Sequence, residues 1–312
     1  MRLITGLAAA LAVAACDMLA PVEPVLTPVA RPAVQTAPGV PVQTVPTSAK
    51  SAQLRAYLAS VQSTQLSQGL LRQDGGGPDT PYTPDMLARN FRRIAFFNEY
   101  GSGSTAVGVS GRLRRWEAPV RMQTIFGPSV PPSQRSQDRA DVTAFASRLA
   151  RATGHPISTA SRPNFLVYFV SEDDRAETIR STAPRLLGLP ETSLRPILNL
   201  SDDIYCAVAS FASARGRYDY TAAVAVIRAE NPDLLRLSCI HEELAQGLGL
   251  ANDSPNARPS IFNDDDEFAL LTSHDEALLG LLYDDRLSTG MTLPDAEPIL
   301  RLLARETLQG PL

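Results

Sequence analysis

Five oxygen-bearing side chains gather in one short segment of the chain, and their spacing suits a shared site. They are Glu242, Glu243, Gln246, Asn252 and Asp253. Glu242 and Gln246 stand four residues apart, so a helix places both on one face, with Glu243 about 100° further round. Gly249 favours a bend that returns the next residues towards that face. The spacing predicts one small polar pocket.

These residue types leave three interpretations open, and none of them involves zinc. Carboxylate and amide oxygens suit a hard divalent cation such as Ca²⁺, Mg²⁺ or Mn²⁺, whereas zinc favours imidazole and thiolate ligands. Without a metal, Glu242 and Glu243 are candidates for general acid and base catalysis, provided that burial keeps one of them protonated. In the third interpretation the buried carboxylates and the amide only brace a loop by hydrogen bonds.

The segment resembles the site helix of the metzincin zinc peptidases, whose signature is H-E-x-x-H-x-x-G-x-x-H. With Gly249 on the glycine of that signature, Glu243 falls on the general base. The three histidine positions are then occupied by Glu242, Gln246 and Asn252. The other register, which starts at His241, puts Ala245 on the second ligand position, where it has no donor atom to offer.

Residues further along extend the resemblance. Matrixin-type metzincins continue through a S-I-M turn beneath the metal and then a helix that ends in L-Y. Here Ser260-Ile261-Phe262 stands at the turn, with Phe262 in place of the methionine, and residues 271–283 match the helix. The resemblance covers residues 232–287. It implies an α/β (α+β) metzincin-like domain with a small mixed sheet and a long site helix.

The same stretch is also similar to an uncharacterised family of bacterial lipoproteins, known as a domain of unknown function. Its core reads E-E-x-x-Q-x-x-G-L-x-N-D and is followed by S-I-F-N-D, as residues 242–253 and 260–264 do here. This resemblance implies that the replacement of the histidines is a family trait. It brings no activity with it.

The first part of the chain predicts export and a lipid anchor. Residues 1–15 place Arg2 before a short apolar run, the pattern of a signal peptide. Val13-Ala14-Ala15-Cys16 resembles a lipobox, so Cys16 is the predicted lipidation site. Residues 16–48 are rich in proline and predict a semi-extended tether. We therefore expect a protein of the cell envelope that is anchored in the membrane and faces the periplasm.

The remaining two cysteines, Cys206 and Cys239, form an even pair in an oxidising compartment. They predict a disulfide, with two buried free thiols as the alternative. Because Cys239 precedes Glu242 by three residues, the bond would hold the site helix.

Composition and motifs exclude several functions. The formal net charge of −4 argues against nucleic acid as a partner. The chain has no G-x-S-x-G elbow for a catalytic serine, no P-loop and no dinucleotide fingerprint.

Hydrophobic periodicity predicts a single folded domain over residues 50–307. Its helices are predicted at residues 50–71, 84–100, 133–153, 234–249 and 294–307. Its strands are predicted at residues 116–126, 165–170, 207–212 and 222–227. The order of these elements is similar to the upper half of a metzincin.

Two functions from different classes remain. The first is a non-catalytic lipoprotein module that binds a peptide or an envelope protein along the cleft or its edge strand. The alternative is a metzincin-related hydrolase, a peptidase with Glu243 as general base and an oxygen-ligated metal. We favour the first, because none of the zinc-ligating histidines is present.

Overall fold

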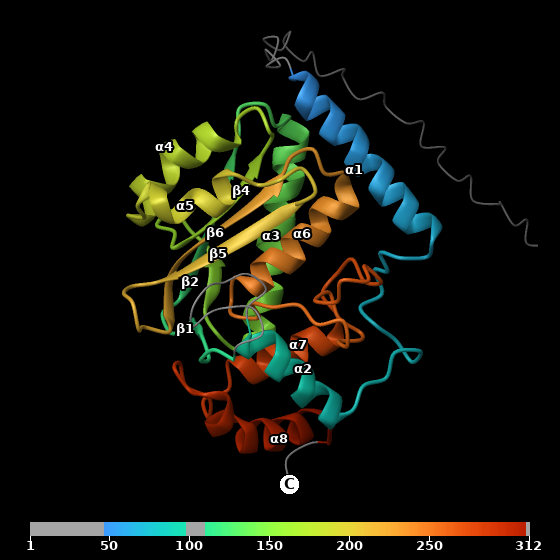
Figure 1. Ribbon diagram of the computed structural model, residues 1–312, viewed down its shortest axis with the longest axis vertical. Helices are drawn as coiled ribbons and strands as arrows, with labels where there is room; N and C mark the ends of the chain where they lie inside the picture. The colour runs from blue at the N-terminus through green and yellow to red at the C-terminus, as the bar shows by residue number, and fades with distance from the viewer. Residues whose placement is uncertain (1–46, 98–109, 310–312) are drawn as a thin grey trace, which may run out of the picture. The chain divides into compact units, whose positions relative to one another are not determined.

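A six-stranded sheet forms the centre of the computed structural model, which describes residues 47–97 and 110–309 (Figure 1). The strands are β1 (Arg115–Trp116), β2 (Val120–Phe126), β3 (Ile157–Thr159), β4 (Phe165–Val170), β5 (Cys206–Ala212) and β6 (Asp219–Arg228). Their order is β1-β6-β4-β2-β3, with parallel neighbours throughout, and β5 pairs antiparallel with β6. The prediction of an α/β fold with a mixed sheet is confirmed.

Helices cover both faces of the sheet. One face carries α3 (Pro132–Thr153) and α6 (Asp233–Gln246), and the other carries α4 (Arg175–Leu187) and α5 (Glu191–Leu198). Strand β4 is buried on both faces. Phe165 and every second residue after it pack in the core beneath α3 and α6, while Leu166 and every second residue after it pack in the core beneath α4 and α5. A strand that is buried on both sides is an unbroken apolar run, as its sequence predicts.

Three further helices extend the larger core beyond the sheet. They are α2 (Pro84–Phe96), α7 (Ser273–Leu282) and α8 (Leu293–Gln309), which contribute Phe91, Leu278 and Leu300 to the cluster around α3 and α6. A fourth helix, α1 (Ala49–Ser67), adds no buried residue to that cluster. None of the helices in the described ranges is both long and apolar enough to cross a membrane.

The predicted helices and three of the predicted strands appear, with differences at their ends. The strand predicted at residues 116–126 is instead two strands, β1 and β2, which pair with different neighbours, and β3 was not predicted. The first helix stops at Ser67 rather than 71, and the described part of the second ends at Phe96. Helices α4 and α5 were not predicted. Each contains an internal proline, Pro184 and Pro196, and proline weakens the helical signal of a short segment.

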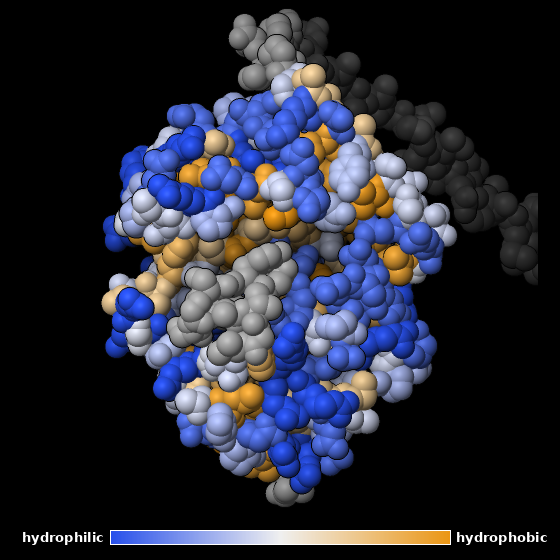
Figure 2. All heavy atoms as spheres, viewed as in Figure 1, coloured by the Kyte–Doolittle hydropathy of each residue, from blue (hydrophilic) through white to orange (hydrophobic). Residues whose placement is uncertain are grey.

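Several expectations concern residues outside the described part of the chain. They are the signal peptide at 1–15, the lipidation of Cys16 and most of the tether at 16–48. The domain limits of 50–307 also stay a prediction. On the face seen in Figure 2, hydrophilic residues predominate and apolar ones form small separate patches.

Candidate functional site

The frame of the candidate site is helix α6, whose end is determined by close packing. The helix stops at Gln246, earlier than the predicted 249, and the backbone turns away through Gly247 and Gly249. Gly249 has a φ of +130°, and a Cβ there would collide with the backbone oxygen of Arg114. The bend that the sequence predicts at Gly249 therefore depends on glycine.

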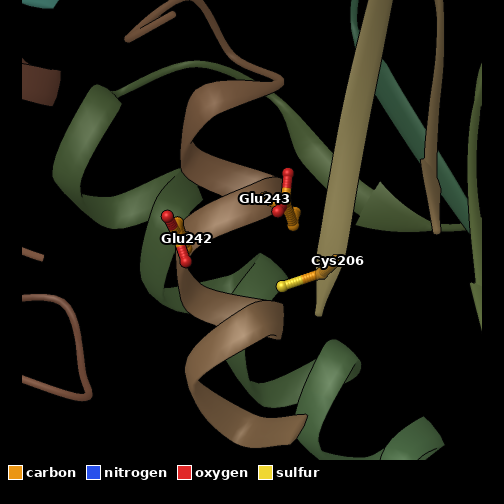
Figure 3. A group of neighbouring side chains, drawn as sticks. All are labelled: Cys206, Glu242 and Glu243. Carbon is orange, nitrogen blue, oxygen red and sulfur yellow. The ribbon is translucent and has the colours of Figure 1, made fainter. Parts of the chain in front are cut away.

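Glu242 and Glu243 meet the edge strand β5 at Cys206. A carboxylate oxygen of each and the Cys206 Sγ lie within 4.8 Å of one another (Figure 3). Glu243 projects towards the strand and is only 4% exposed, while Glu242 is half-buried. Within residues 47–97 and 110–309, no other three His, Cys, Asp or Glu side chains have this spacing. Both carboxylates also take part in other interactions, so they are not free.

The Cys206 sulfur is not available to a metal, because it is bonded to Cys239. The two Cα atoms are 5.9 Å apart, and the predicted disulfide is confirmed. Thiolate sulfur binds metals, whereas disulfide sulfur carries no such charge. The group therefore offers an ion only the two carboxylates.

Strand β5 is tied to α6 at a second point, beyond the two glutamates. The hydroxyl of Ser210 donates to the carbonyl of Gly247 at 3.2 Å, and the Trp116 indole donates to the same oxygen at 2.9 Å. Between the two ties the strand covers about 14 Å and the helix about 12 Å. Strand and helix therefore run side by side, with the glutamates between the ties.

The other predicted site residues separate into two arrangements. Gln246 Nε2 donates to Asp253 Oδ1 at 3.2 Å, so these two side chains meet. The Asn252 amide is buried and donates to the Asp253 carbonyl at 2.6 Å and to Arg93 O of α2 at 3.2 Å. The Asn252 amide nitrogen is thus used to hold the backbone of α2 and of Asp253.

The turn at residues 260–262 is held by Asp275 of α7. The Asp275 carboxylate accepts from the Ser260 hydroxyl and from the Ile261 N–H, and it also closes a capping box with Thr272. Phe262 is fully buried in the main core, and its carbonyl accepts from the Ser254 N–H. The T-x-x-D spacing predicts a helix cap, but nothing in the sequence indicates that this cap also holds the turn.

The histidines do not contribute a ligand set. His241 is 8% exposed, stacks on Phe145 at 4.0 Å between ring centroids, and accepts from the Leu271 N–H through Nδ1. Burial lowers the pKa of His241 to about 3, so the ring is neutral at physiological pH. His274 is fully buried beside Asn90, and His155 contacts the Ala118 carbonyl. Each histidine has a structural partner of its own.

Open α/β sheets often bind ligands at the carboxyl ends of their strands. At the carboxyl ends of β2 and β4 lies the side chain of Asp174. Asp174 accepts from the N–H groups of Ser129 and Ser171, both at 2.9 Å. A Cβ at Gly127 would collide with the Asp174 carboxylate. Asp174 therefore braces the loops that follow β2 and β4.

Comparison with known families gives a match over most of the folded chain. Residues 84–302 match a family model described as a protein of unknown function, DUF2927. The chain belongs to this family. No curated protein and no solved structure matches it.

The DUF2927 match contains every tie described above. The sequence analysis did not single out Ser210, and it did not predict that Asp275 also holds the turn. Their partners lie 37 and 15 residues away, Gly247 and Ser260. The matched range begins at the N-terminus of α2 and does not include α1.

Proposed function

We propose that this DUF2927 protein is an envelope lipoprotein whose domain binds an extended peptide along β5 without cleaving it. The observation that carries the proposal is the double tie between β5 and α6, which fixes an edge strand beside Glu242 and Glu243. In the described residues β6 is the one strand that pairs with β5. An edge strand of this kind recognises peptides through main-chain hydrogen bonds.

The register of β5 identifies the backbone groups that would take part. Arg228 N donates to Tyr205 O at 3.2 Å, so Ala207 and Ala209 pair with β6 in the alternation of antiparallel strands. The N–H and C=O groups of Cys206, Val208 and Ser210 therefore point to the outer edge. The side chains of Cys206 and Ser210 face α6. The N–H and C=O groups of these residues are therefore the groups that β5 would present to a bound peptide.

The topology supports the finer proposal of a degenerate metzincin-like module. A parallel sheet with an antiparallel edge strand, a site helix, a glycine bend and a lower turn follow in the order that the resemblance implies. At the three histidine positions stand Glu242, Gln246 and Asn252. The Asn252 amide nitrogen donates to Arg93 O, so the side chain at the third position braces α2.

A proline substitution tests the edge. Val208→Pro removes one outward N–H at an edge strand, where proline is tolerated, and Val208→Thr is the matched control because it keeps that N–H. Decapeptides selected on the full chain from a random display library should lose at least tenfold affinity for the proline variant and bind the threonine variant normally. Unchanged binding to Val208→Pro would refute the proposal. If that variant fails to fold, N-methylation of alternate peptide amides tests the same hydrogen bonds from the other side.

A second function, a hydrolase with Glu243 as general base, is favoured by one observation. The carboxylates of Glu242 and Glu243 are close enough to share a hard divalent cation. Metal analysis of the purified, untagged domain separates the two proposals. Stoichiometric Ca²⁺, Mg²⁺ or Mn²⁺ that disappears in Glu242→Gln supports the hydrolase, whereas a folded, metal-free domain supports the binding module.

The lipid anchor rests on the sequence around Cys16. Mass spectrometry of the mature N-terminus should show an acylated Cys16, and Cys16→Ser should release the protein from the membrane fraction. A mature chain that starts elsewhere and is soluble would contradict the proposal.

A further inference from the structure

Helix α1 differs from the rest of the fold in how it is attached. It precedes the family match. Its fully buried apolar side chains are Leu54 and Leu58, while Tyr57 and Leu66 are among the most exposed large apolar residues described. α1 contributes no residue to the two large apolar clusters, and Val61 alone of its residues packs against the small cluster of Leu71, Leu235 and Ala269. It therefore shares little of the apolar burial that makes the sheet and its helices cooperative.

Polar side chains attach α1 at its start, in its middle and at its end. At its start, Ser51 Oγ donates to the buried Glu230 at 2.6 Å, and Lys50 pairs with Glu172 at 2.8 Å. In the middle, Gln62 Oε1 accepts from Leu235 N at 3.1 Å. At its end, Gln65 Nε2 donates to Asp266 at 2.6 Å.

The Gln62 contact reaches the helix that carries the candidate site. The N-cap of α6 is Pro232, which gives no side-chain cap, and the first N–H bonded within the helix is that of Arg236. The N–H of Leu235 is one of the groups that a helix start leaves without an internal partner. Gln62 therefore supplies from α1 the cap that α6 lacks. The ribbons of α1 and α6 can be followed in Figure 1.

A natural hinge follows α1. Gly69 has a φ of +77° and open space around it. Directly after it, the N–H groups of Leu71 and Arg72 donate to the carbonyls of Asp266 and Glu267 at 2.9 and 2.8 Å. If α1 detaches, the detached segment would therefore end at Gly69, because Leu71 and Arg72 stay hydrogen-bonded to the rest of the domain.

We propose that α1 is a detachable strap, which opens as a unit about Gly69 while the rest of the domain stays folded. Opening withdraws Gln62 and leaves the first turn of α6 uncapped. The effect on the site rests on the proposed function, whereas the opening itself does not.

Amide hydrogen exchange at single-residue resolution on the full chain tests the strap. We expect α1 amides and the Leu235 amide to exchange at least tenfold faster than those of β4, and with a common opening equilibrium. Val167→Ala, in the buried β4, should speed exchange of the strands but leave α1 and Leu235 unchanged, because strap opening does not expose that site. Equal acceleration of α1 and β4 would show that they open together and would overturn the proposal.

A second pair of variants tests the cap. Gln62→Ala should raise exchange of the Leu235 amide at least tenfold relative to the amides of β4. Gln53→Ala, at an exposed glutamine of the same helix, is the control and should change neither. Unaltered Leu235 exchange in Gln62→Ala would refute the link to α6. These readouts need no ligand, so failure of peptide binding leaves them interpretable.

Discussion

Two corners of the domain hold neighbouring segments by different means. At the glutamate corner, a disulfide and the Ser210 hydroxyl hold β5 beside Glu242 and Glu243. At the Asp275 corner, one buried carboxylate accepts hydrogen bonds from both the turn and the start of α7. Asp275 thus binds groups of the protein itself, whereas Glu242 and Glu243 lie side by side at the edge of the sheet. The contrast is between one carboxylate whose partners are a turn and a helix start, and two carboxylates that lie close together beside β5.

The largest effect is expected from the disulfide. Replacing both Cys206 and Cys239 by serine should lower the free energy of unfolding by about 3 to 4 kcal/mol, since the bond closes a loop across a sequence separation of 33 residues. Urea unfolding of the oxidised protein and the variant measures this. Labelling of the denatured, unreduced protein should find neither thiol reactive. A stable variant that still binds peptide would show that the glutamate corner does not need its covalent tie.

The next largest effect is expected from Asp275→Ala. This change should lower the free energy of unfolding by about 3 kcal/mol or more, because it leaves several buried donors without an acceptor. Asp285→Ala, an exposed acid just beyond the same helix, is the control and should stay within about 0.5 kcal/mol of the wild type. Equilibrium unfolding gives both values. A small loss at Asp275 would remove the distinction between the corners.

Lowering the pH should reduce the free energy of unfolding through His241. Its pKa of about 3 in the folded state lies below the ordinary 6.5, so the unfolded chain binds more protons between those values. Stability therefore falls as the pH is lowered through this window, by about 2 kcal/mol from pH 7.5 to pH 5. His241→Gln should flatten this dependence in urea unfolding at several pH values. An unchanged slope would indicate that other groups dominate the acid response.

The smallest effect on stability is expected at the glutamate corner itself. Glu243→Gln keeps the side-chain shape and an oxygen that can accept a hydrogen bond, so the unfolding free energy should change by less than about 1 kcal/mol. Peptide binding, or hydrolysis if the alternative holds, should be lost. A loss of about 1 to 3 kcal/mol with unaltered function would instead show that Glu243 braces the fold.

Much of the fold was predictable because local patterns determine local structure. The apolar run of β4 and the periodicity of α3 were found at or within a residue of their ends. The short helices α4 and α5 were missed because their internal prolines break the periodic signal. The predicted end of α6 was three residues too late. The helix ends at Gln246 because Gly247 and Gly249 pack closely against Phe165 and Arg114, and these contacts between distant segments are not visible in the local sequence.

The sequence by itself determined the residue types of the site, the cysteine pair and the glycine bend, because spacing along a helix decides which side chains share a face. Only the tertiary structure decided which of those side chains meet. Gln246 reaches Asp253, while Asn252 turns to the backbone of α2. Such choices depend on which elements become neighbours, and the sequence around Asn252 carries no record of the helix that lies 159 positions before it.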